Sequence, residues 1–495
     1  MVTAVLAVLL ASTPPAPEAG ISEALARERA LAVRDLRYDI ALQVPMVRAE
    51  PVTGRMVARF VLAASGRIVL DFARPRDAVR AVRLDGREVP YDVVNGHIVI
   101  ASAAAGPRDL AVDFVAGDEA LNRNDEFLYT LFVPARARLA FPCFDQPDLK
   151  ARYTLTLTVP AGWQAVSNGA ALTRTAGDVA APATLAFAET QPLPTYLFAF
   201  AAGRFTVETA ERNGREMRMF HRETDAAKVA RNRDAIFDLH ASALRWLEDY
   251  TAIPYPFGKF DIVAIPSFTF GGMEHAGAIF YNASGLLLDE SATQNQMLDR
   301  ANVIAHETSH MWFGDLVTMR WFNDVWMKEV FANFMADKIV NPSFPDVNHE
   351  LRFLLAHYPS AYGTDRTAGT NAIRQVLDNL DQAGQMYGPI IYDKAPIVMR
   401  QLEMIMGPDG FRNGLRDYLK AYQFGNATWI DLVRTLDART PRDLAAWSRA
   451  WVEERGRPAM TTRIRTRPDG RVRSIELSSR DAMGRGLVWP QRLVV

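Results

Sequence analysis

The sequence contains a single cysteine, Cys143, among its 495 residues. One cysteine excludes an internal disulfide framework and any metal site built from several thiolates. Cys143 lies in the segment FPCFDQP, where no histidine or basic residue adjoins it to lower its pKa. We therefore expect a buried structural thiol and not a nucleophile.

The sequence also lacks an excess of charge of either sign, because its formal net charge is −1 at pH 7. No overall electric field therefore favours nucleic acid or an anionic membrane as a partner. With 49% hydrophobic and 23% charged residues, the composition is that of an ordinary globular protein. The length suits two or three domains, each with its own core.

Long hydrophobic runs are missing as well. The run from Val2 to Ala11 is too short to span a bilayer and has the length of a signal-peptide core. Small residues and prolines follow it, although no Lys or Arg precedes Arg27. We expect residues 1–20 to be a signal peptide, the protein to be exported (periplasmic or secreted), and no integral membrane span.

Short alternating segments fill residues 21–205 and predict an N-terminal all-β domain. In YTLTLTV, from Tyr153 to Val159, polar and apolar residues alternate without a break, which is typical of a strand with one buried face. The segments RMVARFVL, GRIVLDF, GHIVI and DLAVDFV are further candidate strands, separated by turn residues.

Helical periodicity dominates residues 206–453, beginning with a helix from about Asp225 to Tyr250. Residues 454–495 return to β structure, with a hairpin around Asp469-Gly470 and a last apolar strand in GLVWPQRLVV. Three strands make no stable sandwich, so we expect either an incomplete C-terminal β domain or strands that pack on a neighbour. The predicted fold class is multidomain α+β.

The segment HETSH indicates a metal site. His306 and His310 are four residues apart, so on a helix they share one face and can bind one ion. Glu307 lies beside that ion, where it can hold a water molecule. We expect Asn323-Asp324 to cap the next helix, whose early turns carry Glu329 as a third ligand. Two imidazoles, a carboxylate and a water form a catalytic zinc site.

A glycine pair in FTFGGMEHAG delivers two polar residues, Glu274 and His275, into an apolar run. Alone they could form half of a metal site. A further ligand would close the position that the water needs, so we predict a substrate contact at the edge of a strand that the glycines leave open. The predicted substrate-binding segment is Gly271, Gly272, Met273, Glu274 and His275.

These motifs resemble the aminopeptidase N family of zinc metallopeptidases, which also contains leukotriene-A hydrolase. The family's HExxH, eighteen residues and Glu match His306, Glu307, His310 and Glu329. The segments FPCFDQPDLKARYTL, PYPFGKFDIVAIPSFTFGGMEH and IIYDKAPIVMRQLE resemble its other signatures, so the likeness covers about residues 35–495. It implies a thermolysin-like, mainly helical catalytic domain, the start of a C-terminal β-sandwich, and one Zn²⁺ per chain.

The resemblance also implies residue roles. Glu307 is the general base, Tyr392 stabilises the oxyanion, and Glu274 holds the free α-ammonium of a peptide, which makes the enzyme an exopeptidase. This chain departs from the family by His275 for Asn and by Lys328 for Asn. The family residue that offers a second polar group to the amine aligns near Val133, which cannot do so.

The leading hypothesis is a zinc-dependent aminopeptidase that acts on peptides with a free N-terminus. The alternatives are an epoxide hydrolase like the leukotriene-A hydrolase branch, a catalytically inactive peptide-binding scaffold, and a thermolysin-like endopeptidase, which has no use for Glu274. The sequence does not determine the oligomeric state. We expect surface or packing positions for the other helical histidines: His240, His349 and His357.

Overall fold

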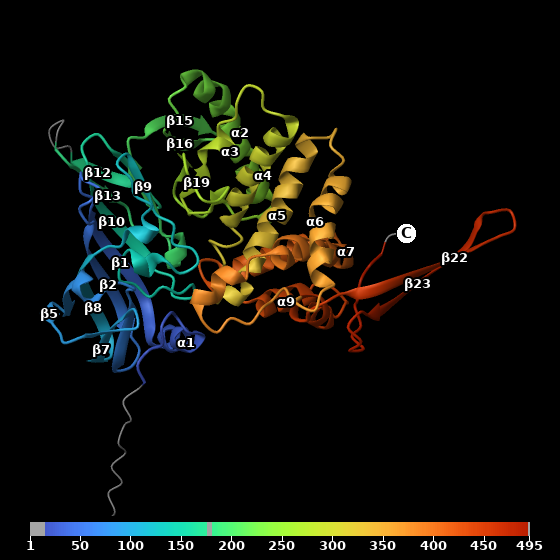
Figure 1. Ribbon diagram of the computed structural model, residues 1–495, viewed down its shortest axis with the longest axis horizontal. Helices are drawn as coiled ribbons and strands as arrows, with labels where there is room; N and C mark the ends of the chain where they lie inside the picture. Colours follow the sequence, from blue (N-terminus) through green and yellow to red (C-terminus); the bar gives the residue numbers. More distant parts are fainter. Residues whose placement is uncertain (1–14, 176–180, 494–495) are drawn as a thin grey trace, which may run out of the picture.

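The computed structural model describes residues 15–175 and 181–493. A β-rich region lies beside a helical region, and a hairpin projects from the helical side (Figure 1). Of the predicted signal peptide, residues 1–14 lie outside the described residues. Within the described helices, none combines the length and the apolar character needed to cross a bilayer.

One large sheet forms the body of the β-rich region, with strand order β12-β13-β10-β1-β2-β8-β4-β5. Strands β1 and β10 pair in parallel, and the other neighbours are antiparallel. The strands are β1 (Val33–Gln43), β2 (Thr53–Leu62), β4 (Val79–Leu84), β5 (Arg87–Glu88), β8 (Gly106–Val115), β10 (Arg152–Val159), β12 (Ala171–Thr175) and β13 (Ala183–Phe187).

Smaller sheets cover this one, in the orders β3-β7-β6 and β11-β14-β9. Their strands are β3 (Gly66–Asp71), β6 (Asp92–Val94), β7 (His97–Ala103), β9 (Phe127–Tyr129), β11 (Gln164–Ser167) and β14 (Phe200–Gly203). The region also contains helix α1 (Glu23–Ala32) and the short helices η1 (Arg76–Ala78), η2 (Asp118–Ala120), η3 (Ala137–Leu139) and η4 (Thr195–Leu197).

The strands predicted from alternation are confirmed. Strand β10 alternates buried and half-buried side chains over its whole length, because every second residue is apolar. The other four segments form β2, β3, β7 and β8. Cys143 is fully buried among aromatic residues, and burial raises the pKa of its thiol, as expected for a structural cysteine.

A second sheet, in the order β15-β16-β17-β19-β18, joins the β-rich region to the helices. It consists of β15 (Thr206–Arg212), β16 (Arg215–His221), β17 (Phe260–Ile265), β18 (Gly272–Met273) and β19 (Ala278–Asn282). Strand β18 lies at its edge and pairs antiparallel with β19. The glycine pair of the sequence therefore starts an edge strand, as predicted.

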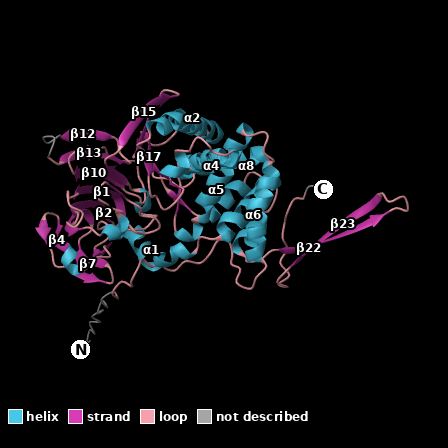
Figure 2. Ribbon diagram, turned by 45° about the horizontal axis from the view of Figure 1, so that its top comes forward, coloured by secondary structure: helices cyan, strands magenta, loops and turns pink. Residues whose placement is uncertain are grey.

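Helices pack against this sheet and against one another, and strands and helices separate clearly in Figure 2. They are α2 (Ala226–Thr251), α3 (Ala283–Leu286), α4 (Gln294–His310), α5 (Trp326–Val340), α6 (His349–Asp365), α7 (Ala395–Met406), α8 (Pro408–Tyr422), α9 (Trp429–Asp437) and α10 (Leu444–Ser448). Connecting them are η5 (Phe322–Asp324), η6 (Asn341–Ser343), η7 (Leu380–Gln385), η8 (Ile390–Lys394), η9 (Arg449–Glu453), β20 (Thr318–Met319) and β21 (Asn426–Ala427).

Side-chain caps begin several helices, including α2 and α4, whereas α5 lacks one. Asp225 caps α2, and Thr293 forms a capping box with Gln296 at the start of α4. The predicted cap of α5 is wrong, because no side chain caps that helix. Asp324 is buried and instead accepts hydrogen bonds from Arg374 and from the backbone N–H of Trp429.

The C-terminal hairpin is confirmed, with β22 (Pro458–Thr466) and β23 (Val472–Asp481) on either side of the Asp469-Gly470 turn. The last predicted strand is wrong, because residues 486–493 are not extended into any described sheet. Trp489 packs instead edge-on against Trp451, with ring centroids 4.9 Å apart. Two exposed strands are thus the described part of the C-terminal β structure.

A buried ion pair ties α1 to the β-rich region. The Arg29 guanidinium donates two hydrogen bonds to the Asp71 carboxylate, at 2.5 and 2.9 Å. The His97 ring lies 2.8 Å from the same carboxylate, and the backbone N–H of Asp145 donates to it. Burial alone would raise the pKa of Asp71, but Arg29 and His97 outweigh it and hold the pKa at about 2.

We predict that Asp71→Asn removes an acid-dependent part of the stability. The folded-state pKa lies below the ordinary 3.8, so the carboxylate contributes about 2 kcal/mol above pH 4, lost as the pH falls towards 2. Urea unfolding at pH 7 and at pH 3 measures the difference between wild type and variant. Asp39→Asn, at an exposed site on β1, is the control and should change little. A wild-type advantage that is equal at both pH values would contradict this role.

Candidate active site

Helix α4 presents His306 and His310 on one face, as their spacing predicts. Their Nε2 atoms lie 3.1 Å apart. Each ring is held through its other nitrogen: Nδ1 of His306 lies 2.8 Å from Asn333 Oδ1, and Nδ1 of His310 lies 3.1 Å from the carbonyl oxygen of Phe313. These contacts orient both rings so that their Nε2 atoms face a common position, and a proton shared at Nδ1 leaves the Nε2 lone pair for a metal ion.

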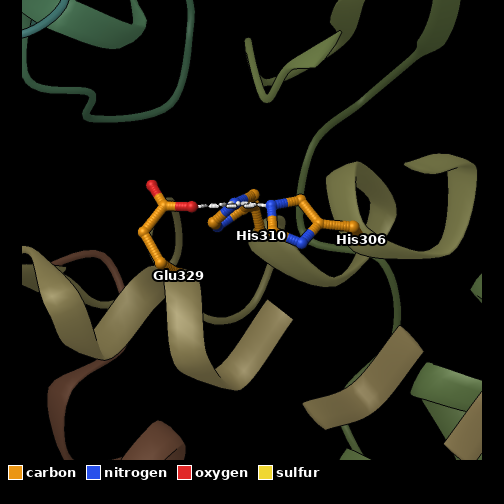
Figure 3. Close-up of side chains that lie close together, drawn as sticks. All are labelled: His306, His310 and Glu329. Carbon is orange, nitrogen blue, oxygen red and sulfur yellow. Dashed lines mark hydrogen bonds and ion pairs between the residues drawn. The ribbon is translucent and has the colours of Figure 1, made fainter. Parts of the chain in front are cut away.

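Glu329 approaches the same position from the first turn of α5. Its Oε2 atom lies 3.6 Å from Nε2 of His306 and 3.9 Å from Nε2 of His310 (Figure 3). Helices α4 and α5 pack closely against each other, which brings the three side chains together. The sequence prediction that these residues converge agrees with this geometry.

The three residues fit a small divalent cation such as zinc. Ligand nitrogens at the usual Zn–N distance of about 2.0–2.1 Å stand about 3.3 Å apart in a tetrahedral site, close to the separation found here. His306, His310 and Glu329 offer one ligand atom each within 4.8 Å of one another. This donor set leaves a fourth position for a water molecule or a substrate atom.

Lys328 is shared between two buried carboxylates. Its Nζ atom lies 2.6 Å from Oε1 of Glu274 and 2.6 Å from Oε1 of Glu329. Burial raises and Lys328 lowers the pKa of Glu274, with a net value of about 2, and the same balance lowers the pKa of Glu329. Because Lys328 occupies Oε1 of Glu329, only Oε2 faces the histidines. The sequence marked Lys328 as unusual but gave it no role.

Glu307 is buried beside this group, with a carboxylate oxygen within 4.8 Å of one of Glu274. Burial raises the pKa of its side chain to about 8, because water is excluded and negative charge lies nearby. A carboxyl with such a raised pKa beside a metal-ligand cluster can take up and release a proton near neutral pH. Gly272 makes room for it, since a Cβ atom on Gly272 would overlap the Glu307 carboxylate.

The glycine-rich edge strand is held in place by the β-rich region. Asn168 donates a hydrogen bond of 2.9 Å to the carbonyl oxygen of Ala276, two residues after Glu274. Lys150 donates to the carbonyl oxygens of Asp315 and Leu316, which follow α4. The β-rich region thereby holds in place both the segment that carries Glu274 and the segment that follows α4.

His275 differs from the predicted substrate contact. It is fully buried, does not line the cavity, and packs edge-on against Phe280 with ring centroids 4.5 Å apart. Burial lowers the pKa of its ring to about 3, so the ring is neutral. Strand β18 ends at Met273, and the backbone N–H of His275 turns back to donate a hydrogen bond to the Met273 carbonyl oxygen, so Glu274 lines the cavity while His275 does not.

The remaining predicted residues surround one cavity of about 840 Å³. Gly271, Gly272, Met273 and Glu274 form one wall, with the metal-ligand cluster and Glu307 at its base. Tyr392, in η8, lies on another wall and stacks against Tyr387 with ring centroids 6.2 Å apart. Val133 lines the cavity too, at the position where the sequence offered no polar group.

Several cavity residues were not found from the sequence. His349, Arg352 and His357 line the cavity from α6, whereas we expected surface or packing positions for the two histidines. Asn333 was missed, although it lies four residues after Glu329 on the same helix. That spacing places both on one face and was a usable signal.

Comparison with known families matches two family models to this chain. A family model described as "Peptidase family M1 domain" matches residues 236–451, and one described as "Peptidase M1 N-terminal domain" matches residues 118–197. Together they cover more than half of the chain.

Similar proteins include the puromycin-sensitive aminopeptidase of Caenorhabditis elegans, with 33% identity over 72% of this chain and 38% of that protein. The probable aminopeptidase 1 of Sulfurisphaera tokodaii is 29% identical over 78% of this chain and 49% of its own length. The leucyl aminopeptidase of Saccharolobus solfataricus is 31% identical over 68% of this chain and 42% of its own length. The chain thus spans half or less of the length of these relatives.

We predict that Lys328→Met destabilises the metal-free protein strongly. The change leaves Glu274 and Glu329 buried without their shared cation, which costs about 3–5 kcal/mol of unfolding free energy. Urea unfolding in the presence of a chelator measures the loss. Lys338→Met on the same helix is the matched control, because the Lys338–Glu403 pair is partly exposed and should cost about 1 kcal/mol or less. Equal losses for the two variants would refute the special role of Lys328.

Proposed function

Because this chain belongs to peptidase family M1, the aminopeptidase N family of zinc metallopeptidases, we propose that it is a zinc-dependent aminopeptidase. It removes residues from the N-termini of peptides. The observation that carries this proposal is the position of Glu274, whose carboxylate lines the cavity beside the His306, His310 and Glu329 cluster. A fixed carboxylate at that place measures one residue from the scissile bond.

His306, His310 and Glu329 are the residues that would hold a zinc ion. When bound, zinc lowers the pKa of a coordinated water molecule and polarises the carbonyl group of the scissile bond. Glu307 takes the proton of the attacking water and delivers it to the leaving amine. A nearby cation favours the ionised form of Glu307, which is the form that a general base requires.

Glu274 binds the α-ammonium group of the substrate. Lys328 occupies Oε1 of Glu274, while Oε2 accepts no hydrogen bond from the described side chains. Oε2 is therefore the acceptor for the substrate amine. Because Val133 lines the cavity without offering a polar group, amine recognition rests on this one carboxylate oxygen.

Tyr392 stabilises the oxyanion that forms on the scissile carbonyl. Its hydroxyl is protonated at neutral pH, because a phenol has a pKa of about 10 and partial desolvation and the nearby Glu329 raise that pKa further. A neutral phenol can donate a hydrogen bond to developing negative charge, an interaction that acts mainly in the transition state. The π-helical turn of η8 carries the residue.

We further propose that the chain is divided as its sequence suggests, into residues 21–205, 206–453 and 454–495, and that it is exported from the cell. The support for export is the apolar segment at residues 2–11, followed by prolines.

We predict that Glu307→Gln keeps zinc and loses turnover. The amide fills the same space but cannot take up a proton, so kcat should fall about 10³-fold. Zinc content per chain and kcat on an aminoacyl fluorogenic amide are measured together. Glu290→Gln, at an exposed glutamate just before α4, should retain wild-type activity. Near-normal turnover in Glu307→Gln would refute the proposed general base.

We predict that acetylation of the substrate amine abolishes cleavage, because the neutral amide cannot pair with Glu274. A panel of aminoacyl fluorogenic amides, free and acetylated, is assayed with and without a chelator. Only free substrates should be hydrolysed, and only without chelator. Comparable hydrolysis of blocked and free substrates would overturn the exopeptidase proposal, and activity that survives full zinc removal would overturn the zinc mechanism.

A further inference from the structure

The cavity continues beyond the metal-ligand cluster along one face of α5. Glu329, Asn333, Asp337 and Asn341 follow one another at intervals of four residues, which places them in one row on the helix surface. All four line the cavity. The helical hydrogen bonding reaches Asn341, whose backbone N–H donates to the carbonyl oxygen of Asp337.

The direction of this polar row follows from the contacts between α4 and α5. His310 lies near Glu329, and His306 lies near Asn333, so the two helices run antiparallel. Glu274 is bound to Lys328 at the start of α5. The row therefore leads away from the proposed amine site and towards the leaving-group side of the scissile bond.

Helix α6 closes the opposite side of this part of the cavity. Arg352 lies 3.2 Å from Asp299, which is two turns before His306 on α4. The ion pair connects α6 to α4 across the row, and Asp299 and Arg352 both line the cavity. The polar row thus lies between α4 and α6 in a part of the cavity that is partly open to solvent, since the side chains of Asp299 and Arg352 are 69% and 36% exposed.

A second cavity of about 950 Å³ begins where the row ends. Asp337 and Asn341 line both cavities, so their side chains stand between the two. The second cavity lies between α2, α5, α7 and α8, with Trp246, Arg400 and Arg416 in its walls. Nothing in the proposed chemistry at the metal-ligand cluster uses it.

The polar groups between the two cavities have unused hydrogen-bonding capacity. Oδ1 of Asn341 is buried and has no hydrogen-bond partner within the described residues. The Asp337 carboxylate is half-buried and lies within electrostatic range of Arg400, His357, Arg352 and His349, with none of which it forms a described hydrogen bond. Buried polar groups without partners are costly, so a ligand that supplies N–H and C=O groups at regular intervals is favoured there.

We propose that the row from Asn333 to Asn341 binds the main chain of an oligopeptide on the leaving-group side, and that the second cavity receives its distal end. This inference rests on the proposed function, since it specifies the substrate class of the same site. The row from Glu329 to Asn341 covers about 18 Å at the helical rise, which corresponds to about five residues of extended peptide. Oligopeptides of about six residues are therefore the preferred substrates.

A length series tests this proposal. Peptides of the form Leu-(Ala)n-amide, with n from one to seven, are assayed for kcat/KM with the wild-type enzyme. They are also assayed for the dissociation constant with the Glu307→Gln variant. We expect both affinity and kcat/KM to improve about tenfold or more up to n of about five and then to level off, because each engaged residue adds main-chain hydrogen bonds.

The matched variants are Asn341→Trp and Asn295→Trp. The first places a bulky ring between the two cavities, and the second places the same ring on the exposed first turn of α4. Asn341→Trp should shift the plateau to shorter peptides and leave a leucyl fluorogenic amide unaffected, while Asn295→Trp should change neither. Thermal unfolding of each variant shows whether the fold is retained. If the tryptophan is not tolerated, Asn341→Ala replaces Asn341→Trp in the assay, since it only widens the opening between the two cavities.

The outcomes separate this inference from the proposed function. Hydrolysis of leucyl amide, with affinity and kcat/KM that do not depend on n, overturns the oligopeptide inference and keeps the aminopeptidase. A length dependence that is identical in wild type and Asn341→Trp also overturns it. Absence of all hydrolysis refutes the proposed function, and the dissociation constants of the Glu307→Gln variant then decide the inference separately.

Discussion

The buried ammonium group of Lys328 compensates the negative charge of the carboxylates in the site. Glu274, Glu307 and Glu329 are all removed from water and lie close together, an arrangement that costs several kcal/mol per charge without compensation. Lys328 bridges two of them at 2.6 Å. Glu307, which receives no such bridge, has its pKa raised by burial. Lys328 thus holds the pKa of two carboxylates low, while burial and the negative charge of its neighbours raise the pKa of the third.

The rest of the fold serves to place these groups. The close packing of α4 against α5 brings the histidines to Glu329, and the same packing brings Asn333 to the back of His306. The β-rich region holds the opposite wall through Asn168 and Lys150, which bind backbone carbonyl groups near Glu274 and after α4. Within that region, the buried pair of Arg29 with Asp71 joins α1 to strand β3. Backbone anchors of this kind fix positions without adding charge to the cavity.

Sequence patterns predicted those features that depend on the geometry of a single helix or strand. Alternation in residues 153–159 predicts β10, and the four-residue spacing of His306 and His310 predicts their convergence, because both depend only on the period of one element. Contacts between distant residues are not predicted in this way. The sequence context of Asp324 is that of a helix cap, but its carboxylate accepts a hydrogen bond from Arg374, fifty residues away. The strand expected near Trp489 failed similarly, because packing on Trp451 outweighed the β pattern. The pairing of Lys328 with Glu274 joins separate elements, so no pattern within either segment could reveal it.

His275 shows how such long-range constraints also limit charge in the site. The sequence places it next to Glu274, where a protonated imidazole would compete with a substrate amine for the carboxylate. Burial against Phe280 lowers the pKa of the ring to about 3 and keeps it neutral at physiological pH. His310 is likewise held neutral by burial, with a pKa of about 4, which is the state that a metal ligand requires. Among the described residues around Glu274, Lys328 is therefore the cation that sets its charge balance, and the free Oε2 oxygen is left for a positively charged ligand.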